Sequence, residues 1–133
     1  MREKFRAPWL PSVIGVLAAI LTIDAARELL YVPPHQAQFI LLGILLEGDV
    51  AWATALAHML FLGWLTFACF TRRPAAVIGI LAYCAYWIVT VWVWSQLHAP
   101  GDTGTKLITS SLVTVMLLVV CRVAVGNRSA FDR

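Results

Sequence analysis

The chain has 133 residues, of which 61% are hydrophobic and 13% are charged, and its formal net charge is +3. A soluble domain is nearer half apolar and about a quarter charged, so the composition predicts a single domain whose solvent is lipid. The basic residues cluster at the ends of apolar runs instead of along one polar stripe. Nucleic-acid binding is therefore excluded as the reason for the positive charge.

Four apolar stretches are each long enough to cross a bilayer as a helix, which takes about 20 residues. They lie at residues 9–30, 50–70, 74–97 and 105–125. Because a backbone in lipid must satisfy its own hydrogen bonds, each stretch is expected to be helical. The chain is thus predicted to be all-α: a single membrane domain over residues 1–133, built as a polytopic four-transmembrane-helix bundle.

Residues 35–47 are too few for another crossing, although they include the apolar run Phe39–Leu42. They form either a short helix at the outer interface or an extension of the second span. A continuous helix from Gln36 to Phe70 would be about 52 Å long and would project well past the membrane. Gly43 and Gly48 allow a bend, so a separate short helix on the outer side, after the first span, is favoured.

Lysine and arginine predict the orientation. Eight basic residues fall on one side of the predicted spans, and only Arg27 and Lys106 fall toward the other. The basic side is expected to be the cytoplasm. Both termini should therefore be cytoplasmic, and the protein should be a multi-pass component of the cell (inner) membrane, in contact with the lipid bilayer.

The first span carries a polar face near its outer end. Asp24, Arg27 and Glu28 are spaced i, i+3 and i+4 and so share one side of a helix, and Tyr31 extends it. Asp24 would lie about 9 Å below the outer surface, where a charge is costly and usually pairs or serves a site. Asp24 is either a group that handles a proton, a metal or a substrate, or one half of a structural pair with Arg27.

His58 in the second span is predicted to lie about 13 Å from the outer end, near mid-membrane. Thr54 shares its face one turn away. A histidine at this depth can accept a proton, bind a metal or donate a hydrogen bond to a quinone. An interhelical hydrogen bond, worth about 1 kcal/mol, is the structural alternative. Asp24 and His58 are the candidate catalytic residues, as acid and base.

Further residues are candidates for holding a ligand. Those expected to line a ligand or quinone site are Glu28, Thr54, Trp87 and Trp94. Those with ligand types suitable for zinc or copper, although their spacing matches no motif, are His35, Glu47, Asp49, His98 and Asp102. Haem is disfavoured because His58 and His98 lie at different depths. The cofactor is otherwise unknown, with quinone as the candidate.

Two cytoplasmic stretches are similar to a known family. Residues 62–76, LGWLTFACFTRRPAA, resemble the junction of the second and third spans in the DoxX family, where a glycine-containing apolar run reaches a threonine–arginine turn and a proline or alanine pair. Residues 126–133, GNRSAFDR, resemble that family's closing pattern. The first span and residues 31–49 depart from it. The resemblance implies a membrane component of a redox assembly, with quinone as electron acceptor, and supplies no catalytic motif.

Three functions remain as alternatives. The first is an accessory or quinone-side subunit of a membrane oxidoreductase complex, with an outward-facing polar cavity. The second is a stand-alone membrane enzyme acting on a lipid-like substrate, and the third is a small dimeric carrier for protons, metals or organic cations. Whether the chain is itself an enzyme stays open at this point. Its expected partners are other membrane subunits or further copies of itself.

Overall fold

The computed structural model describes residues 7–98 and 100–132. Most of this chain is helical. The four long helices are α1 (Leu10–Tyr31), α2 (Gly48–Phe70), α3 (Ala75–Leu97) and α4 (Thr103–Gly126). Each begins and ends within about two residues of its predicted apolar stretch, so the four predicted helices are confirmed. Three of them, α2, α3 and α4, are long and apolar enough to cross a membrane.

Local sequence explains where the helices begin and end. Pro11 lies in the first turn of α1, where its missing N–H costs no hydrogen bond. At the end of α2, Arg72 adopts a positive φ of 52°. Its N–H donates to the Cys69 carbonyl at 3.1 Å, and the Arg73 N–H donates to the Ala68 carbonyl at 2.9 Å. This is a Schellman motif with arginine in the place usual for glycine, and it turns the chain directly into α3.

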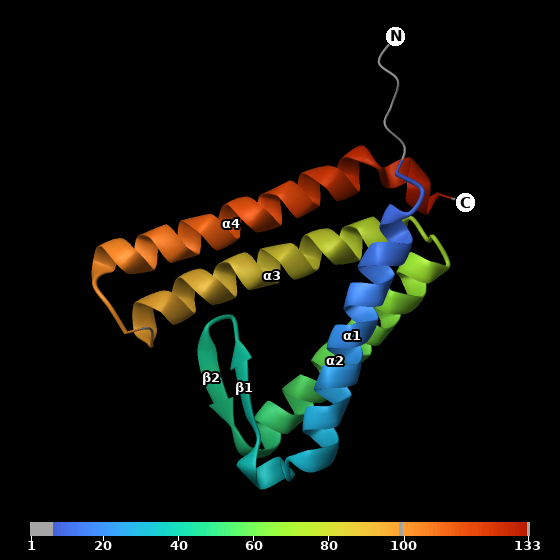
Figure 1. Cartoon of the computed structure of the whole chain (residues 1–133). Helices are drawn as coiled ribbons and strands as arrows, with labels where there is room; N and C mark the ends of the chain where they lie inside the picture. The colour runs from blue at the N-terminus through green and yellow to red at the C-terminus, as the bar shows by residue number, and fades with distance from the viewer. Residues whose placement is uncertain (1–6, 99, 133) are drawn as a thin grey trace.

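The helices associate as two antiparallel pairs (Figure 1). In the first pair, α1 packs along α2 through small residues. A Cβ on Gly15 would lie 3.3 Å from the Cys69 Cβ, and one on Gly63 would lie 3.8 Å from the Thr22 methyl. Small residues at these positions let two helix backbones approach closely.

The second pair, α3 and α4, is joined by polar side chains. The Ser110 hydroxyl donates to the Ser95 hydroxyl at 2.9 Å, and the Trp92 indole N–H donates to the Thr114 hydroxyl at 2.8 Å. Ser95 and Ser110 are both buried. These hydrogen bonds give the Trp92 indole N–H and the Ser110 hydroxyl a partner inside an apolar helix pair.

The two pairs meet at the end of the molecule where both described chain ends lie. The Ala7 N–H donates to the Asn127 side-chain oxygen at 3.1 Å. A short 3₁₀ helix, η2 (Arg128–Phe131), follows α4 and inserts Phe131, which is 0% exposed. Phe131 belongs to one core cluster with Leu65 of α2 and Ile80 of α3. The main core therefore sits at this joined end.

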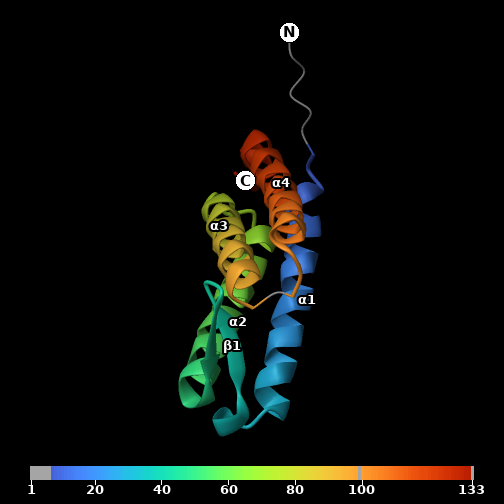
Figure 2. The ribbon, with the colours of Figure 1, turned by 90° about the vertical axis from the view of Figure 1, so that its left-hand side faces the viewer.

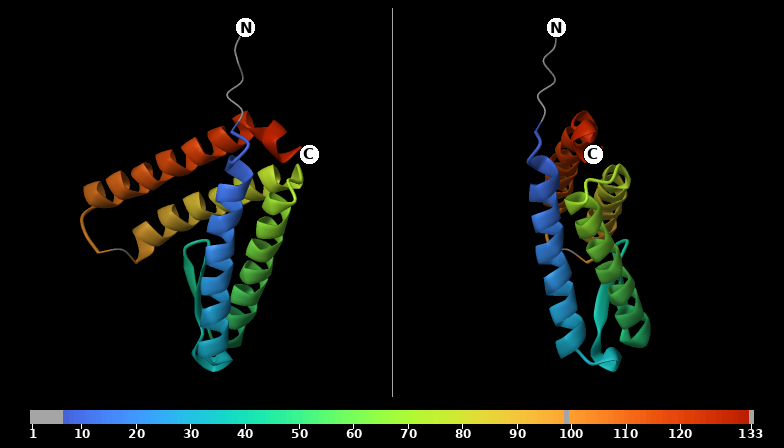
Figure 3. Two further views of the ribbon diagram at one scale, coloured as in Figure 1. Left: turned by 45° about the vertical axis from the view of Figure 1, so that its right-hand side comes forward. Right: turned by 90° about the vertical axis from the view of Figure 1, so that its right-hand side faces the viewer.

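Away from the joined end the two pairs diverge, and a β-hairpin stands between them (Figures 1 and 3). After a 3₁₀ turn, η1 (Pro34–Gln36), strand β1 (Gln38–Leu41) pairs antiparallel with β2 (Ile44–Glu47). The two-residue loop has positive φ at both positions, 50° at Leu42 and 84° at Gly43, as a type I′ hairpin turn requires. The expected short outer helix at 35–47 is therefore wrong, and the fold is mostly α rather than all-α.

The predicted four-helix bundle is not confirmed, because the two pairs separate instead of lying parallel around one axis (Figure 1). The helices also leave many large apolar side chains exposed, for example Leu30, Ile78 and Ile108. A soluble monomer usually exposes large apolar side chains only singly. The exposure is compatible with a lipid environment for a multi-pass protein.

Candidate functional site

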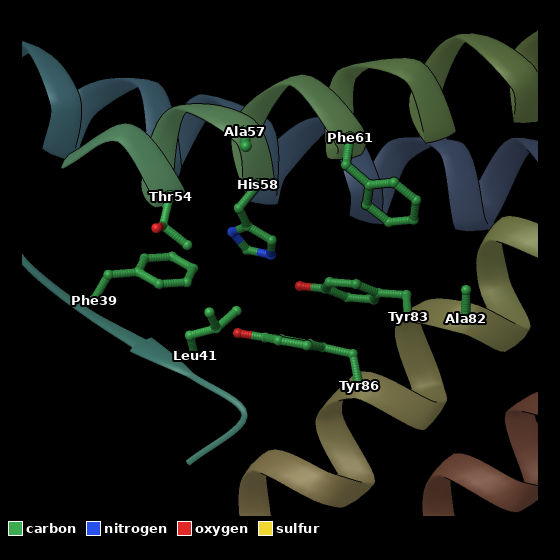
Figure 4. A pocket seen from close by; sticks show the side chains of 9 residues that line it. All are labelled: Phe39, Leu41, Thr54, Ala57, His58, Phe61, Ala82, Tyr83 and Tyr86. Atoms are coloured by element: carbon green, nitrogen blue, oxygen red, sulfur yellow. The ribbon is translucent and has the colours of Figure 1, made fainter. Parts of the chain in front are cut away.

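An aromatic pocket lies where the β-hairpin, α2 and α3 come together (Figure 4). It encloses about 300 Å³. The hairpin, α2 and α3 supply its lining, which consists of Phe39, Leu41, Thr54, Ala57, His58, Phe61, Ala82, Tyr83 and Tyr86. Because these residues come from three segments of the chain, only the assembled fold creates the pocket.

Aromatic rings surround His58 in this pocket. Its imidazole stacks with the Tyr83 ring at a centroid distance of 5.7 Å and meets the Phe39 ring edge-on at 5.4 Å. The Tyr86 ring lies 6.0 Å away. These distances are typical of attractive pairs of aromatic rings, so the side chains form a preorganised wall with flat surfaces.

The Nε2 atom of His58 is buried and has no hydrogen-bond partner. Buried polar atoms are nearly always hydrogen-bonded in folded proteins, so each exception requires an explanation. The imidazole points away from α2 toward the hydroxyl ends of Tyr83 and Tyr86 (Figure 4). A polar atom in this position is available to a ligand that enters the pocket.

The hairpin wall of the pocket is held in place from α3. The Tyr86 hydroxyl donates to the Ile40 carbonyl at 2.8 Å. Further along α3, Val93 and Trp94 pack directly against the hairpin tip, where a Cβ on Gly43 would lie 2.7 Å from the Trp94 backbone nitrogen. The position of the hairpin, and with it that of Phe39, therefore depends on α3.

The two candidate catalytic residues do not share a site. His58 lines the aromatic pocket, whereas Asp24 is exposed on α1 and lines a separate shallow pocket with Arg27, Glu28 and Tyr31. The predicted polar face of α1 is thus present, but it points away from the aromatic pocket. An acid–base pair formed by Asp24 and His58 has no geometric basis in this structure.

The predicted ligand-lining residues are divided among different places. Thr54 lies in the aromatic pocket beside His58, although its hydroxyl donates to the Val50 carbonyl at 2.7 Å. Trp87 contacts the pocket from behind, meeting the rings of both pocket tyrosines edge-on. Trp94 stacks on His98 at 4.1 Å, and Glu28 lies on α1, so both are outside the pocket.

The structure does not bring the predicted metal ligands together. Within residues 7–98 and 100–132, no three of the histidine, cysteine, aspartate and glutamate side chains are grouped for a metal ion. His35 lies in η1, Glu47 ends β2 and Asp49 begins α2, whereas His98 and Asp102 flank the turn from α3 to α4. The Glu47 carboxylate instead accepts a hydrogen bond from the Gln38 amide at 3.4 Å.

Sequence reasoning missed the hairpin residues of the pocket, Phe39 and Leu41, and missed Tyr86. Tyr86 had a detectable signal, since Tyr83, Tyr86 and Trp87 are spaced i, i+3 and i+4 and so share a helix face. The hairpin had a weaker one. Gly43 lies between the apolar runs 39–42 and 44–46, but Leu42 occupies the turn position where asparagine or aspartate is usual.

Comparisons of the chain with protein families, with characterised proteins and with solved structures each found no match.

Proposed function

We propose that this chain is a four-span membrane protein whose aromatic pocket binds the ring of a quinone, and that it serves as the quinone-side accessory subunit of a membrane oxidoreductase. The observation that carries the proposal is the buried, unpartnered Nε2 atom of His58 among three aromatic rings. The resemblance to the DoxX family points to the same class of function.

The four-span arrangement is supported by the packing of α1. Three helices are long and apolar enough to span a membrane, and α1 runs along one of them, α2, for most of its length. A helix that lies beside a spanning helix occupies the same layer. The joined end carries Arg72, Arg73 and Arg128, and by the positive-inside rule this charge supports a cytoplasmic location for that end.

The pocket chemistry suits a quinone ring. Flat aromatic walls stack on a conjugated ring, and a neutral imidazole with its proton on Nε2 donates a hydrogen bond to a carbonyl oxygen. A volume of about 300 Å³ is at the lower end for small-molecule sites. This volume accommodates a ring system, while the isoprenoid tail would remain in the lipid.

The chain's own part in the reaction is to hold the ring and to exchange a proton at His58. Reduction of a quinone to a quinol takes up two electrons and two protons. The residues that line the pocket include no side chain that donates two electrons, so the electrons would come from a catalytic partner subunit. A stand-alone enzyme with Asp24 and His58 as acid and base is less well supported, because the two residues line separate pockets.

The test is quinone binding to the protein in lipid nanodiscs, measured by quenching of tryptophan fluorescence with a short-tailed ubiquinone analogue. Trp87 adjoins the pocket tyrosines and should report binding. Wild type should give saturable quenching. His58→Phe keeps a ring but loses the donor, and should weaken binding by about 2- to 10-fold.

The matched control is His98→Phe, the same substitution at a histidine outside the pocket, and it should bind like wild type. Quenching that never saturates, or that is identical in wild type and His58→Phe, would contradict the proposal. The subunit role is tested separately by purification in mild detergent, where the chain should co-purify with a larger membrane partner. Recovery of the chain alone from its native membrane would count against that role.

A further inference from the structure

One face of α1 is unpartnered and carries both charged and apolar side chains. Asp24, Arg27, Glu28 and Tyr31 are exposed and line a shallow pocket of about 320 Å³ together with Val32. The opposite side of α1 is the one that packs on α2. The charged half of α1 forms an outer flank of the molecule (Figures 2 and 3).

The charged face continues toward the joined end as a stripe of exposed apolar residues. We call this surface the α1 stripe. Its members are Val13, Leu17, Ile20, Asp24, Arg27, Glu28 and Tyr31. Successive members are mostly three or four residues apart, the spacing by which one helix packs against another in a membrane or a coiled coil.

Asp24 and Arg27 lie alongside α2, within its length rather than beyond its end. Thr22 is opposite Gly63, which is fifteen residues into α2, or about 22 Å from its beginning at 1.5 Å per residue. Asp24, two residues further along α1, therefore lies about 19 Å from the beginning of α2 and about 10 Å from the end of α1 itself at Tyr31. Charged side chains at such depth are expensive in lipid and normally face other protein or water. Within the described chain, α1 packs mainly on α2 and, near the joined end, on η2, while Glu28 also borders a small cavity lined by Gln36, Gln38 and Trp52.

We propose that the α1 stripe is the contact face for a second copy of this chain within the membrane. A two-fold axis along the membrane normal brings equal residues of two copies to equal depth. Arg27 of one copy then meets the Asp24 or Glu28 carboxylate of the other, forming charge-assisted hydrogen bonds away from water. The Tyr31 hydroxyl, three residues from Glu28, donates to the remaining carboxylate.

This charge pattern is what selects a second copy as the occupant. Each stripe presents an acid, a base and an acid in succession, so the surface complements itself when two copies align in parallel. The proposal rests on α1 crossing the membrane, as in the proposed four-span arrangement. It does not depend on what the aromatic pocket binds.

Cysteine cross-linking tests the contact in native membranes. Ile20→Cys and Val119→Cys form a matched pair, since both positions are 57% exposed on apolar helices and only residue 20 belongs to the stripe. Both are placed in a Cys121→Ala background, because Cys121 is partly exposed and could itself be oxidised. Cys69 and Cys84 are buried and are kept. With two differently tagged copies co-expressed, oxidation should join both tags through residue 20 and not through residue 119.

Failure of this inference can be distinguished from failure of the four-span arrangement. Labelling of Ile20→Cys from water by a membrane-impermeant maleimide would show that α1 does not cross the membrane. That result would overturn both the dimer contact and the four-span arrangement. If residue 20 is not labelled and still forms no two-tag product, the dimer alone is overturned. The same holds if the two-tag product through residue 20 is no more abundant than the product through residue 119. A cross-link to a different protein also overturns it.

Charge exchange provides a second readout that does not rely on one variant folding. Arg27→Glu alone, or Asp24→Lys combined with Glu28→Lys, should each raise the dimer dissociation constant at least about tenfold, because a desolvated charge loses its partner. Mixing the two variants should restore association to near the wild-type constant. The interface is refuted if Arg27→Glu associates as tightly as wild type. It is also refuted if mixing the two variants restores no association and residue 20 forms no cross-link.

Discussion

Gly43 at the hairpin tip offers the sharpest test of how the pocket is built. Its φ of +84° is in the left-handed region, and a Cβ there would lie 2.7 Å from the Trp94 backbone nitrogen. In Gly43→Ala, the left-handed conformation should cost about 1–2 kcal/mol. The contact with α3 adds an overpacking cost of about 1–3 kcal/mol, because a backbone atom cannot move aside cheaply.

The expected result of Gly43→Ala is withdrawal of the hairpin tip from α3. Amide hydrogen exchange in residues 38–47 should become faster, and quinone binding should weaken because Phe39 and Leu41 form one wall of the pocket. Thermal unfolding in detergent should report a loss of about 2–5 kcal/mol, the sum of the strain and the overpacking costs. Hydrogen exchange localises the effect to the hairpin.

Gly48→Ala is the matched control. Gly48 also has a positive φ, +69°, but nothing lies within 4 Å of the position its Cβ would take. This variant should carry only the backbone strain of about 1–2 kcal/mol and should leave the hairpin tip protected. If the two variants have equal stability, exchange and binding, the contact of the tip with α3 does not position the hairpin and the reasoning fails.

Three further expectations concern single contacts. Tyr86→Phe removes the hydrogen bond to the Ile40 carbonyl and should speed amide exchange in the hairpin, whereas Tyr83→Phe should not; equal exchange in both would contradict this. Phe131→Ala should lower the free energy of unfolding in detergent by about 3–5 kcal/mol, because Phe131 is fully buried. Phe70→Ala, at a half-exposed phenylalanine, should lower it much less. Similar losses in both variants would mean that η2 does not complete the core. The Thr105 hydroxyl donates to the Asp102 carboxylate and lowers the pKa of that carboxyl, so wild type should exceed Thr105→Val in thermal stability above about pH 3.9. That advantage should vanish as the pH falls through the lower folded-state pKa, and a difference that persists in stronger acid would disprove the linkage.

The apolar runs alone were sufficient to predict the four helices. A run of about 20 apolar residues in lipid forms a helix because its backbone N–H and C=O groups must hydrogen-bond to one another. Prolines at 11, 33 and 74 mark helix boundaries, because the proline ring is not accepted inside a helix. His58 and its neighbour Thr54 were also found from sequence, because one helical turn relates them. These features depend on residues close together in the chain.

Tertiary structure decided the rest. The short segment 38–47 can form a helix or a hairpin on local grounds, and its contacts with α3 at Ile40 and Gly43 favour the hairpin. Phe39 and Tyr86 line the same pocket although they are 47 positions apart in the sequence. No local sequence pattern can predict such a contact. Asp24 and His58 lie apart for the same kind of reason. Gly15 and Gly63 determine how α1 is rotated against α2, and that rotation turns Asp24 outward while His58 faces α3.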